Sequence, residues 1–323
     1  MFYSLIIPIY NRPEEMEELL ASLTQQQYRD FEIIVVEDGS TLPCREVVAR
    51  YEERLSIRYF TKPNSGPGPS RNYGAQHAKG DYLLFVDSDC ILPPEYLSEI
   101  EKALQDNPTD LFGGSDRAAK SFNALQQAIS FSMTSLLTTG GIRGSQRRVD
   151  HFYPRSFNMG IRREVFEQIG GFPPHSFGED MDLSIRLIRA GYSSSYFAGP
   201  FVYHKRRATW RSFFRQVKHF GEGRLYLSFT YPFTFRIYHL MPSLFTLYLL
   251  LAVVAGFWLP WLWAPLALLV LLLGADALIK TKSLHIALLS IFASFVQLVG
   301  YGSGFLLALV RLLTGGKNVT QRD

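Results

Sequence analysis

The chain has 323 residues, of which 47% are hydrophobic, and carries a formal net charge of +4 with a pI near 8.9. This length allows one large domain or two smaller ones. The positive charge is too weak to indicate a nucleic-acid-binding protein. A mean hydropathy of +0.02 is high for a soluble enzyme, and most of the apolar excess lies after Ile237. Composition therefore divides the chain into a mixed, charged part and an apolar tail.

The cysteine content argues against a disulfide-stabilised protein, and the residue pattern at the amino terminus argues against a signal peptide. Cys44 and Cys90 are the only cysteines and have no metal-ligand spacing, so they predict no disulfide framework and suit a reducing compartment. The first residues, MFYSLIIPIYNRP, have no basic segment ahead of the apolar run. We expect them to form a core strand and not a signal peptide.

The charged part alternates apolar runs with amphipathic segments. Strands are predicted at residues 2–9, 31–36, 57–61, 82–86 and 111–113, and helices from Pro13 and at 45–53, 70–78, 94–106, 122–137 and 163–169. In the first helix, Met16, Leu19, Leu20 and Leu23 recur on one face. Alternating strands and helices predict an α/β fold with a mostly parallel sheet and right-handed crossovers.

The most informative stretch is residues 80–91, GDYLLFVDSDCI. An apolar run consistent with a buried strand ends in Asp87 and Asp89, with one serine between them. Ligands of open α/β sheets bind at the carboxyl ends of the strands, where two carboxylates suit a hard cation such as Mg²⁺ or Mn²⁺. The alternative is a strand followed by a polar turn, because a bare D-x-D arises by chance in many chains.

Two helix starts carry charged residues. The loop KPNSGPGPSRNYG lacks the G-x-G-x-x-G spacing, which excludes a Rossmann fingerprint, but Arg71 near its helix start could face a diphosphate or, equally, solvent. Residues 178–180, Gly-Glu-Asp, open a helix with Leu183, Leu187 and Ile188 as its expected apolar face. An acid pair in that position is often only a helix cap. Between them, residues 138–149 form a Gly- and Arg-rich loop that is predicted to be a mobile lid.

The rest of the chain predicts a membrane protein. Residues 204–236 interleave bases and aromatic rings, a pattern typical of a membrane surface. Residues 237–313 then contain two or three predicted spans, at 237–257, 262–279 and 284–310, and residues 314–323 form a tail. An aromatic turn around Trp258–Trp263 separates the first two spans, and Gly300 and Gly304 give a weak helix-packing signal.

The side of each loop follows from its positive charges. Lys280 and Lys282 place the charged domain inside. Three spans would then put Arg311 and Lys317 outside, against the positive-inside rule. The third segment alternatively lies at the interface or re-enters the membrane.

Five ordered blocks resemble the family 2 glycosyltransferases, which are inverting enzymes of the GT-A fold that use nucleotide sugars. The blocks are SLIIPIYNR, VVEDGS, PSRNYGAQHAKGDYLLFVDSD, NMGIRREVFEQIGGF and GEDMDLSIRLIRAGY. They cover residues 2–204, so the resemblance implies a GT-A-type nucleotide-sugar-binding domain over residues 1–203. The blocks are specific for the family but not for the substrate.

The resemblance also implies roles for individual residues. The nucleotide sugar is expected at Pro8, Tyr10, Asn11, Asp38, Arg71 and Asp87. Mn²⁺ or Mg²⁺ is expected at Asp89, Asp87 and His204, with a helix-start or surface role as the alternative for His204. Asp180 matches the catalytic base, and Asn158, Met159, Gly178 and Glu179 fall in the acceptor region.

These roles fit a reaction with a single displacement at the anomeric carbon of the donor sugar. A divalent ion neutralises the leaving diphosphate, while a carboxylate takes the proton of the attacking hydroxyl. Processive synthases carry Q-x-x-R-W after the acid pair, where this chain reads TWRSFFRQVKHFGEG, so single-sugar transfer is favoured.

The leading hypothesis is a multi-pass cell-membrane enzyme whose catalytic domain faces the cytoplasm. It would transfer sugar from a nucleotide-diphosphate donor to a glycan or lipid-linked hydroxyl in surface glycan or glycolipid assembly. Transfer to polyprenyl phosphate and a membrane scaffold with a degenerate transferase domain are the alternatives.

Overall fold

The computed structural model describes residues 1–119, 122–139, 152–174 and 178–315. The chain forms two compact units, Met1–Ala119 with His151–Lys205, and Lys120–Asp150 with Arg206–Asp323. The described residues 122–139, which the family resemblance placed in the first domain, group with the second unit. Apart from Thr138 and Thr139, the predicted lid lies outside the described residues.

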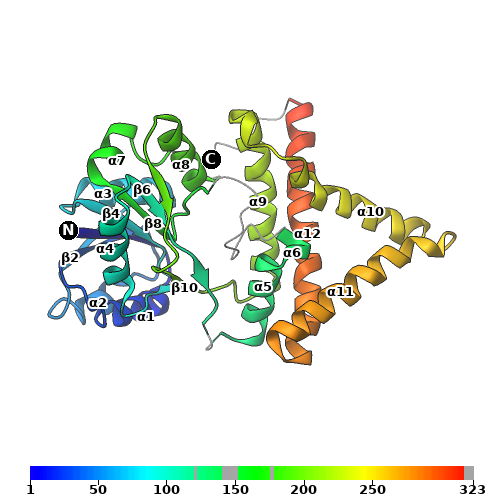
Figure 1. The fold of residues 1–323 in the computed structure, drawn as a ribbon, viewed down its shortest axis with the longest axis horizontal. Coiled ribbons are helices and arrows are strands. Elements are labelled where there is room, and N and C mark those ends of the chain that lie inside the picture. The colour runs from blue at the N-terminus through cyan, green and yellow to red at the C-terminus, as the bar shows by residue number, and fades with distance from the viewer. Residues whose placement is uncertain (120–121, 140–151, 175–177, 316–323) are drawn as a thin grey trace. The chain divides into compact units, whose positions relative to one another are not determined.

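A seven-stranded sheet forms the centre of the first unit (Figure 1), in the order β3-β2-β1-β4-β8-β6-β9. Its strands are β1 (Tyr3–Ile9), β2 (Phe31–Asp38), β3 (Ile57–Lys62), β4 (Tyr82–Val86), β6 (Leu111–Gly113), β8 (Asn158–Arg162) and β9 (Ser194–Tyr196). Strands β3, β2, β1 and β4 are mutually parallel, and β6 pairs parallel with β9. The predicted mostly parallel sheet is confirmed.

The sequence pattern gave no prediction for β8, which is antiparallel to both β4 and β6. Its five residues, NMGIR, begin and end with polar side chains and are too short to show a period of two. The pairing places Asn158 opposite Val86, at the carboxyl end of β4. The strand therefore closes the sheet next to the two aspartates of the D-x-D.

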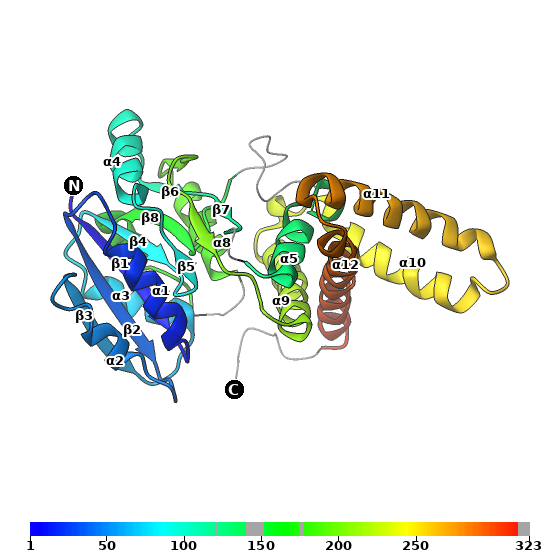
Figure 2. The same cartoon turned by 90° about the horizontal axis from the view of Figure 1, so that it is seen from below.

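Helices cover both faces of this sheet (Figure 2). They are α1 (Pro13–Leu23), α2 (Arg45–Ala49), α3 (Pro67–Gln76), α4 (Tyr96–Asp106), α7 (Arg163–Ile169) and α8 (Glu179–Arg189). One core cluster joins α1, α2 and α4 to the sheet through residues such as Leu5 and Ile7. A second joins α3, α7 and α8 to the other face through residues such as Ile6. Neighbouring β1 side chains thus point to opposite layers, as the pleat requires.

The helix predictions were correct in type but not always in extent. All four apolar residues predicted for the buried face of α1 are buried. Helix α3 begins at Pro67, three residues before the predicted start, because proline is favoured in the first turn of a helix. The expected apolar face of α8 was wrong at Ile188, which is 36% exposed, whereas Leu183 and Leu187 are fully buried.

A small second sheet, in the order β5-β10-β7, lies beside the carboxyl end of β4. Its strands are β5 (Cys90–Ile91), β7 (Asp116–Arg117) and β10 (Val202–His204). Because β10 pairs antiparallel with β5, His204 lies opposite Cys90. Residues more than a hundred positions apart in the sequence are thereby brought next to Asp89.

The described residues of the second unit form helices and short turns. The helices are α5 (Ala124–Thr134), α6 (Leu136–Thr139), α9 (Trp210–Thr230), α10 (Met241–Ala255), α11 (Trp263–Thr281) and α12 (Leu284–Leu313), with short 3₁₀ turns at Pro232–Thr234, Ile237–Leu240 and Pro260–Leu262. Three segments, Ile237–Ala255, Pro260–Thr281 and Leu284–Leu313, are long and apolar enough to cross a membrane.

We predict that Gly160→Ala lowers the apparent melting temperature of the chain by several degrees. A Cβ at this position in β8 would lie 2.1 Å from the ring of Phe112, which is fully buried. Overpacking of this kind typically costs about 1–3 kcal/mol. Thermal unfolding of the purified chain in detergent measures the loss.

Phe112→Leu provides the matched control, because it removes the ring atoms that the new methyl group would meet. The double variant should lose less stability than the sum of the two single variants. Strictly additive losses would contradict the proposed clash.

Candidate active site

The carboxyl ends of three parallel strands meet at one edge of the sheet. Tyr10 and Asn11 follow β1, Asp38 ends β2, and Asp87 follows β4. Because these strands are neighbours, the polar residues that follow them lie along the same edge. This is the edge at which α/β sheets bind ligands.

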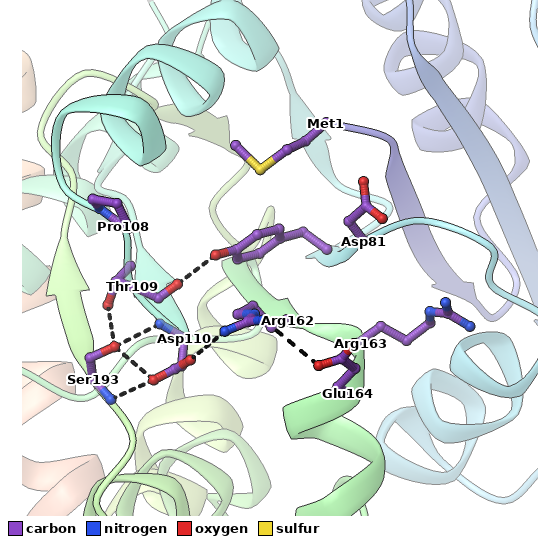
Figure 3. Close-up of a pocket in the computed structure, with 10 residues that line it drawn as sticks. Met1, Asp81, Pro108, Thr109, Asp110, Arg162, Arg163, Glu164 and Ser193 are labelled. Carbon is purple, nitrogen blue, oxygen red and sulfur yellow. Dashed lines mark hydrogen bonds and ion pairs between the residues drawn. The ribbon is translucent and has the colours of Figure 1, made fainter.

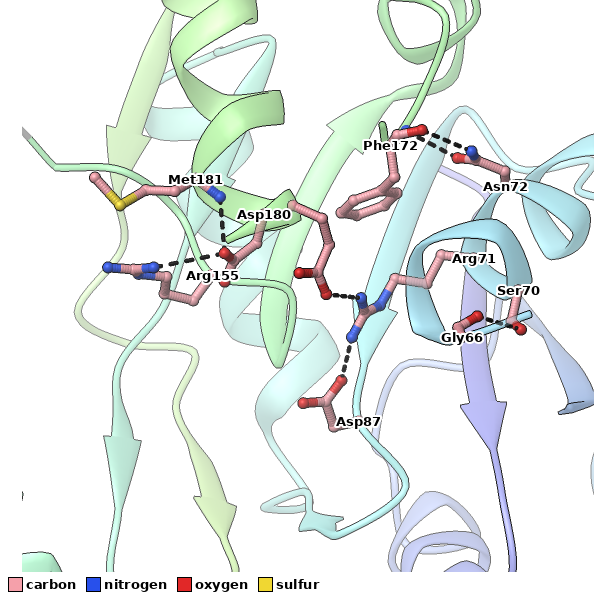
Figure 4. Close-up of polar contacts among 10 residues, drawn as sticks. Gly66, Ser70, Arg71, Asn72, Asp87, Arg155, Phe172, Asp180 and Met181 are labelled. Atoms are coloured by element: carbon pink, nitrogen blue, oxygen red, sulfur yellow. Dashed lines mark hydrogen bonds and ion pairs between the residues drawn. The ribbon is translucent and has the colours of Figure 1, made fainter. Parts of the chain in front are cut away.

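Arg71 connects this edge to the start of α8 (Figure 4). Its Nη2 donates to Asp87 Oδ1 at 2.7 Å, and its Nη1 donates to Glu179 Oε1 at 3.3 Å. The guanidinium lies over the ring of Phe172, 5.3 Å from the ring centroid, and the residue is only 3% exposed. One buried cation therefore fixes the first aspartate of the D-x-D relative to the acid pair.

The electrostatics of this contact favour a charged arginine. Burial alone would lower the pKa of Arg71, but the carboxylates of Asp87 and Glu179 raise it above its usual value. Burial raises the pKa of Glu179, and the neighbouring Asp180 raises it further. Within this cluster, Glu179 is thus held in an environment that disfavours its ionised form.

Asp180 has fewer constraints than its neighbour. Its Oδ1 accepts a hydrogen bond from the Met181 amide at 2.7 Å and lies 3.5 Å from Nη1 of Arg155. Both contacts use the same carboxylate oxygen. These two contacts hold the carboxylate in place at the start of α8.

Asp89 lies between two bases. Its Oδ2 accepts from Arg12 Nη1 at 2.6 Å, and its Oδ1 lies 3.0 Å from His204 Nε2. The backbone of Lys205 also donates to the Asp89 carbonyl, which ties the end of β10 to the D-x-D. Nδ1 of His204 is buried without a hydrogen-bond partner among the described residues.

Asp89, Cys90 and His204 each offer one ligand atom, and these atoms lie within 4.8 Å of one another. Burial raises the pKa of the Cys90 thiol, and the charges of Asp89 and Asp87 add to this, so the thiolate that would bind a metal is disfavoured. Carboxylate and imidazole remain, and a site with oxygen and nitrogen donors suits a divalent metal ion. The residues present therefore fit a divalent cation at Asp89 and His204.

The Asp38 carboxylate is buried and organises the loop ahead of α3. It accepts hydrogen bonds from the amides of Ser65 at 3.0 Å and Gly66 at 2.9 Å, and it pairs with Lys62. Asn64 donates to its backbone carbonyl. Since α3 begins at Pro67, Asp38 also fixes the start of the helix that carries Arg71.

The residues after β1 differ in how they are held. Tyr10 is 50% exposed at the edge of the sheet. Asn11 has a φ of 53°, and its Oδ1 accepts from the amides of Thr41 and Leu42, so it joins the loops that follow β1 and β2. Pro8 is half-buried within β1. Tyr10 is thus the residue of this group with an open side chain.

Two of the residues expected in the acceptor region point into the protein. Asn158 is fully buried, donating to the carbonyls of Ser115 and Pro200 and accepting from the Tyr96 hydroxyl. Met159 belongs to the core under α7 and α8. Gly178 has a φ of 62° and precedes the acid pair. Of this group, Gly178 and Glu179 lie with the catalytic candidates, and the side chains of the other two do not.

Among the described residues, three bases that contact carboxylates of the site carried no predicted role. They are Arg12, Lys62 and Arg155. Arg12 is the last residue of the first sequence block and directly follows a strand end. That position was the only feature of the sequence that could have indicated a role for it in the site. The others find their carboxylates only after distant segments come together.

A cavity of about 470 Å³ lies at the other end of β4 (Figure 3), lined by Met1, Asp81, Tyr82, Pro108, Thr109, Asp110, Arg162, Arg163, Glu164 and Ser193. Its charges are largely paired: Arg162 contacts Asp110 at 3.4 Å and Glu164 at 3.7 Å. The cavity includes none of the aspartates that follow the strands. The catalytic candidates therefore lie at the opposite edge.

Comparison with known proteins shows the family. The sequence model described as glycosyl transferase family 2 matches residues 4–170. An uncharacterized glycosyltransferase of Haemophilus influenzae is 30% identical over 195 residues, 58% of this chain and 62% of that protein. Glycosyltransferase AglE of Haloferax volcanii is 28% identical over 201 residues, 60% of this chain and 64% of that protein. The chain thus spans less than two thirds of the length of these curated relatives.

Solved structures show the same fold. The mannosyltransferase PcManGT from Pyrobaculum calidifontis, in complex with GDP-Man and Mn²⁺, matches with a TM-score of 0.59 and 20% identity over 96% of this chain and 86% of that one. Residues 1–349 of Staphylococcus aureus TarS, in complex with UDP-GlcNAc, match with a TM-score of 0.51 and 19% identity over 98% and 93% of the two chains. At these identities, the likeness shows a GT-A fold.

We predict a pH-dependent effect of Glu179→Gln on stability. Since the fold raises the pKa of Glu179, this carboxyl contributes stability below its ordinary pKa of about 4.3, and that contribution is lost as pH rises through the raised value. Glutamine cannot ionise, so the melting temperature of the variant should rise relative to that of the unaltered chain as pH increases from about 4.3 through the raised pKa of Glu179.

Glu53→Gln, at an exposed position, is the matched control and should show no such trend. Thermal unfolding at several pH values measures both. A difference for Glu179→Gln that falls with increasing pH would contradict the raised pKa.

Proposed function

The chain belongs to glycosyl transferase family 2, and we propose that it moves a sugar, with inversion, from a nucleotide-diphosphate donor to a hydroxyl acceptor. The observation that carries this proposal is the buried contact of Arg71 with Asp87 and Glu179, which joins the D-x-D to the acid pair. This contact holds the carboxylates of the D-x-D at a fixed distance from those of the acid pair. We infer that the donor lies between them.

The base and ribose of the donor are assigned to Pro8, Tyr10, Asn11 and Asp38. The half-exposed ring of Tyr10 supports this assignment, because a flat aromatic surface at a strand end suits a nucleobase. The Asp38 carboxylate holds the neighbouring loop in position. Its contribution to donor binding is therefore at least partly the placement of α3 and Arg71.

The diphosphate is assigned to the other end of the site. Asp89 and His204, with Asp87 nearby, would hold Mn²⁺ or Mg²⁺. When bound, the ion would supply positive charge to the leaving diphosphate. Arg12 contacts the Asp89 carboxylate, and Arg71 binds Asp87. Both arginines therefore place positive charge where the diphosphate is assigned, which favours an anion there. Their guanidinium groups hold the two aspartates in place.

The proton chemistry is assigned to Asp180. An acceptor hydroxyl must lose its proton as it attacks the anomeric carbon, and a carboxylate at hydrogen-bonding distance can take that proton. Gly178 and Glu179 lie beside it and are assigned to the acceptor side, with Asn158 and Met159 supporting the wall behind them. No covalent intermediate is required for a single displacement.

A lipid-linked acceptor is favoured by the three helices that are long and apolar enough to cross a membrane. We infer a multi-pass cell-membrane enzyme that builds a surface glycan or glycolipid, with the first unit on the cytoplasmic side, because Lys280 and Lys282 lie at the end of the hairpin of apolar helices. Polyprenyl phosphate is the second candidate acceptor, and its oxygen is already ionised. It would need no catalytic base.

We predict that Asp180→Asn lowers transfer by about 10²–10⁴-fold, the usual contribution of general base catalysis, and leaves the donor dissociation constant nearly unchanged. Donors to test are UDP-GlcNAc and GDP-mannose, with hydroxyl and polyprenyl phosphate acceptors in parallel. Asp106→Asn, at an exposed helix end, is the matched control.

The two acceptor classes give different outcomes. Full activity of Asp180→Asn with a hydroxyl acceptor would contradict the assigned base. Activity that survives only with polyprenyl phosphate would favour the second candidate. A chain that binds no nucleotide sugar would support a scaffold role instead.

We also predict that Asp89→Asn and His204→Gln each weaken Mn²⁺-dependent donor binding about tenfold or more, since even outer-shell partners of a metal have effects of this size. Cys90→Ser should have little effect, because the protonated thiol is a poor ligand. Isothermal titration calorimetry with and without Mn²⁺ measures each variant. Equal losses for all three, or binding independent of Mn²⁺, would contradict the site.

A further inference from the structure

Helices α10 and α11 form a hairpin with an aromatic tip. At the tip, the Tyr248 hydroxyl donates to the Leu262 carbonyl at 2.6 Å. A hydrophobic cluster of Ala252, Leu262 and Leu266 joins the two legs there. Residues 237–255 and 263–281 have 19 residues each. At 1.5 Å per residue each leg is about 28 Å long, close to the hydrocarbon thickness of a bilayer.

Helix α12 contacts both legs at the end opposite the tip. A Cβ at Gly302 would lie 2.3 Å from the carbonyl of Pro242, in the first turn of α10. Ala287 packs with Leu273 and Ala277, in the last turns of α11. Gly302 and Ala287 are about 22 Å apart along the helix. A third span running alongside the hairpin would meet the legs near the tip as well as at the base.

Figures 1 and 2 agree with these contacts: α10 and α11 converge away from α12, and α12 runs across the open base of the hairpin. The cluster at the tip is composed of α10 and α11 residues and of the short turn between them. Helix α12 is thus transverse to the legs. If the legs cross a bilayer, α12 lies parallel to its plane.

Helix α9 packs along α12 over most of its own length. Gly221, Gly300 and Gly304 permit the close approach, since a Cβ at Gly221 would lie 2.1 Å from the Tyr301 carbonyl. Trp210 contacts Phe292 near one end of the pair. At the other end, Leu225 packs with Phe305 and Ala308. The two helices therefore run side by side, and α9 must share the depth of α12.

The charges of α9 decide whether α12 crosses the membrane or lies in its plane. Arg211 and Arg215 are exposed, and Lys218 and Arg224 are partly exposed. If α12 crossed the membrane, these four bases would be distributed through the hydrocarbon beside it, which is costly. With α12 in the plane of the membrane, all four can lie at headgroup depth.

We propose that α12 is an in-plane interfacial helix that rests on anionic lipid headgroups, and that the α10–α11 hairpin is the only part of the described chain that enters the bilayer. The number of crossings is then even. Lys280, Lys282 and Arg311 lie on the same side as the bases of α9, which satisfies the positive-inside rule. The proposal requires a membrane but not the chemistry of the first unit.

Sidedness tests the proposal in the full-length chain. Two variants each add one cysteine to the chain: Arg54→Cys, exposed in the first unit, and Thr314→Cys, just after α12. Each is treated with a membrane-impermeant maleimide in sealed inside-out and right-side-out vesicles. The native Cys44 and Cys90 are buried and serve as the background. Labelling of both positions from the same side is the expected result. Labelling of Thr314→Cys from the opposite side would overturn the proposal.

Depth gives a second measurement that does not depend on transfer activity. Spin labels are placed at exposed α12 positions, Leu288, Phe292, Leu307 and Val310, in vesicles that contain an anionic lipid, with Leu250 of α10 as the deep reference. An in-plane helix predicts shallow positions for all four, with differences set only by the direction in which each side chain points around the helix. A spanning helix predicts labels at Phe292 that are about 6 Å deeper than at Leu288, from four residues of rise, and this result would overturn the proposal.

Discussion

The structure of the site depends on one buried cation. Arg71 is enclosed by protein and binds Asp87, at the end of β4, and Glu179, at the start of α8. Removing one partner of a buried ion pair typically costs about 3–5 kcal/mol, because the remaining charge is left uncompensated. Asp38 in turn fixes the start of the helix that carries Arg71. The ends of β2 and β4 and the start of α8 are therefore connected through the side chains of Asp38 and Arg71.

The same principle recurs around the site. Asp89 is held by Arg12 and His204, Asp180 lies near Arg155, and Asp38 pairs with Lys62. Each carboxylate that the family resemblance singled out has a basic neighbour. This arrangement holds several acids at fixed positions within a small volume, as the proposed binding of a donor with its cation requires. Glu179 also contacts Arg71, but burial, and after it the neighbouring Asp180, still raise its pKa.

Much of the scaffold could be predicted from sequence, because long periodic segments determine their own structure. The strand at Tyr82–Val86 and the buried face of α1 are examples. Short strands such as β5 and β10 could not be predicted, since two or three residues carry no periodicity and form only by pairing with each other. For the same reason, ordered blocks identified the acids of the site, but not Arg155 or Lys62, whose partners are set by tertiary contacts. Exposure of Ile188 likewise depends on what packs against α8.

The central claim is that Asp87 and Glu179 belong to one donor site because they share Arg71. A double-mutant cycle of Asp87→Asn and Glu179→Gln, measured as the dissociation constant of UDP-GlcNAc or GDP-mannose, tests it most directly. Shared binding to one guanidinium predicts non-additive effects, with a coupling of about 0.5–3 kcal/mol. Additive effects, or an unaltered chain that binds no nucleotide sugar, would contradict the account.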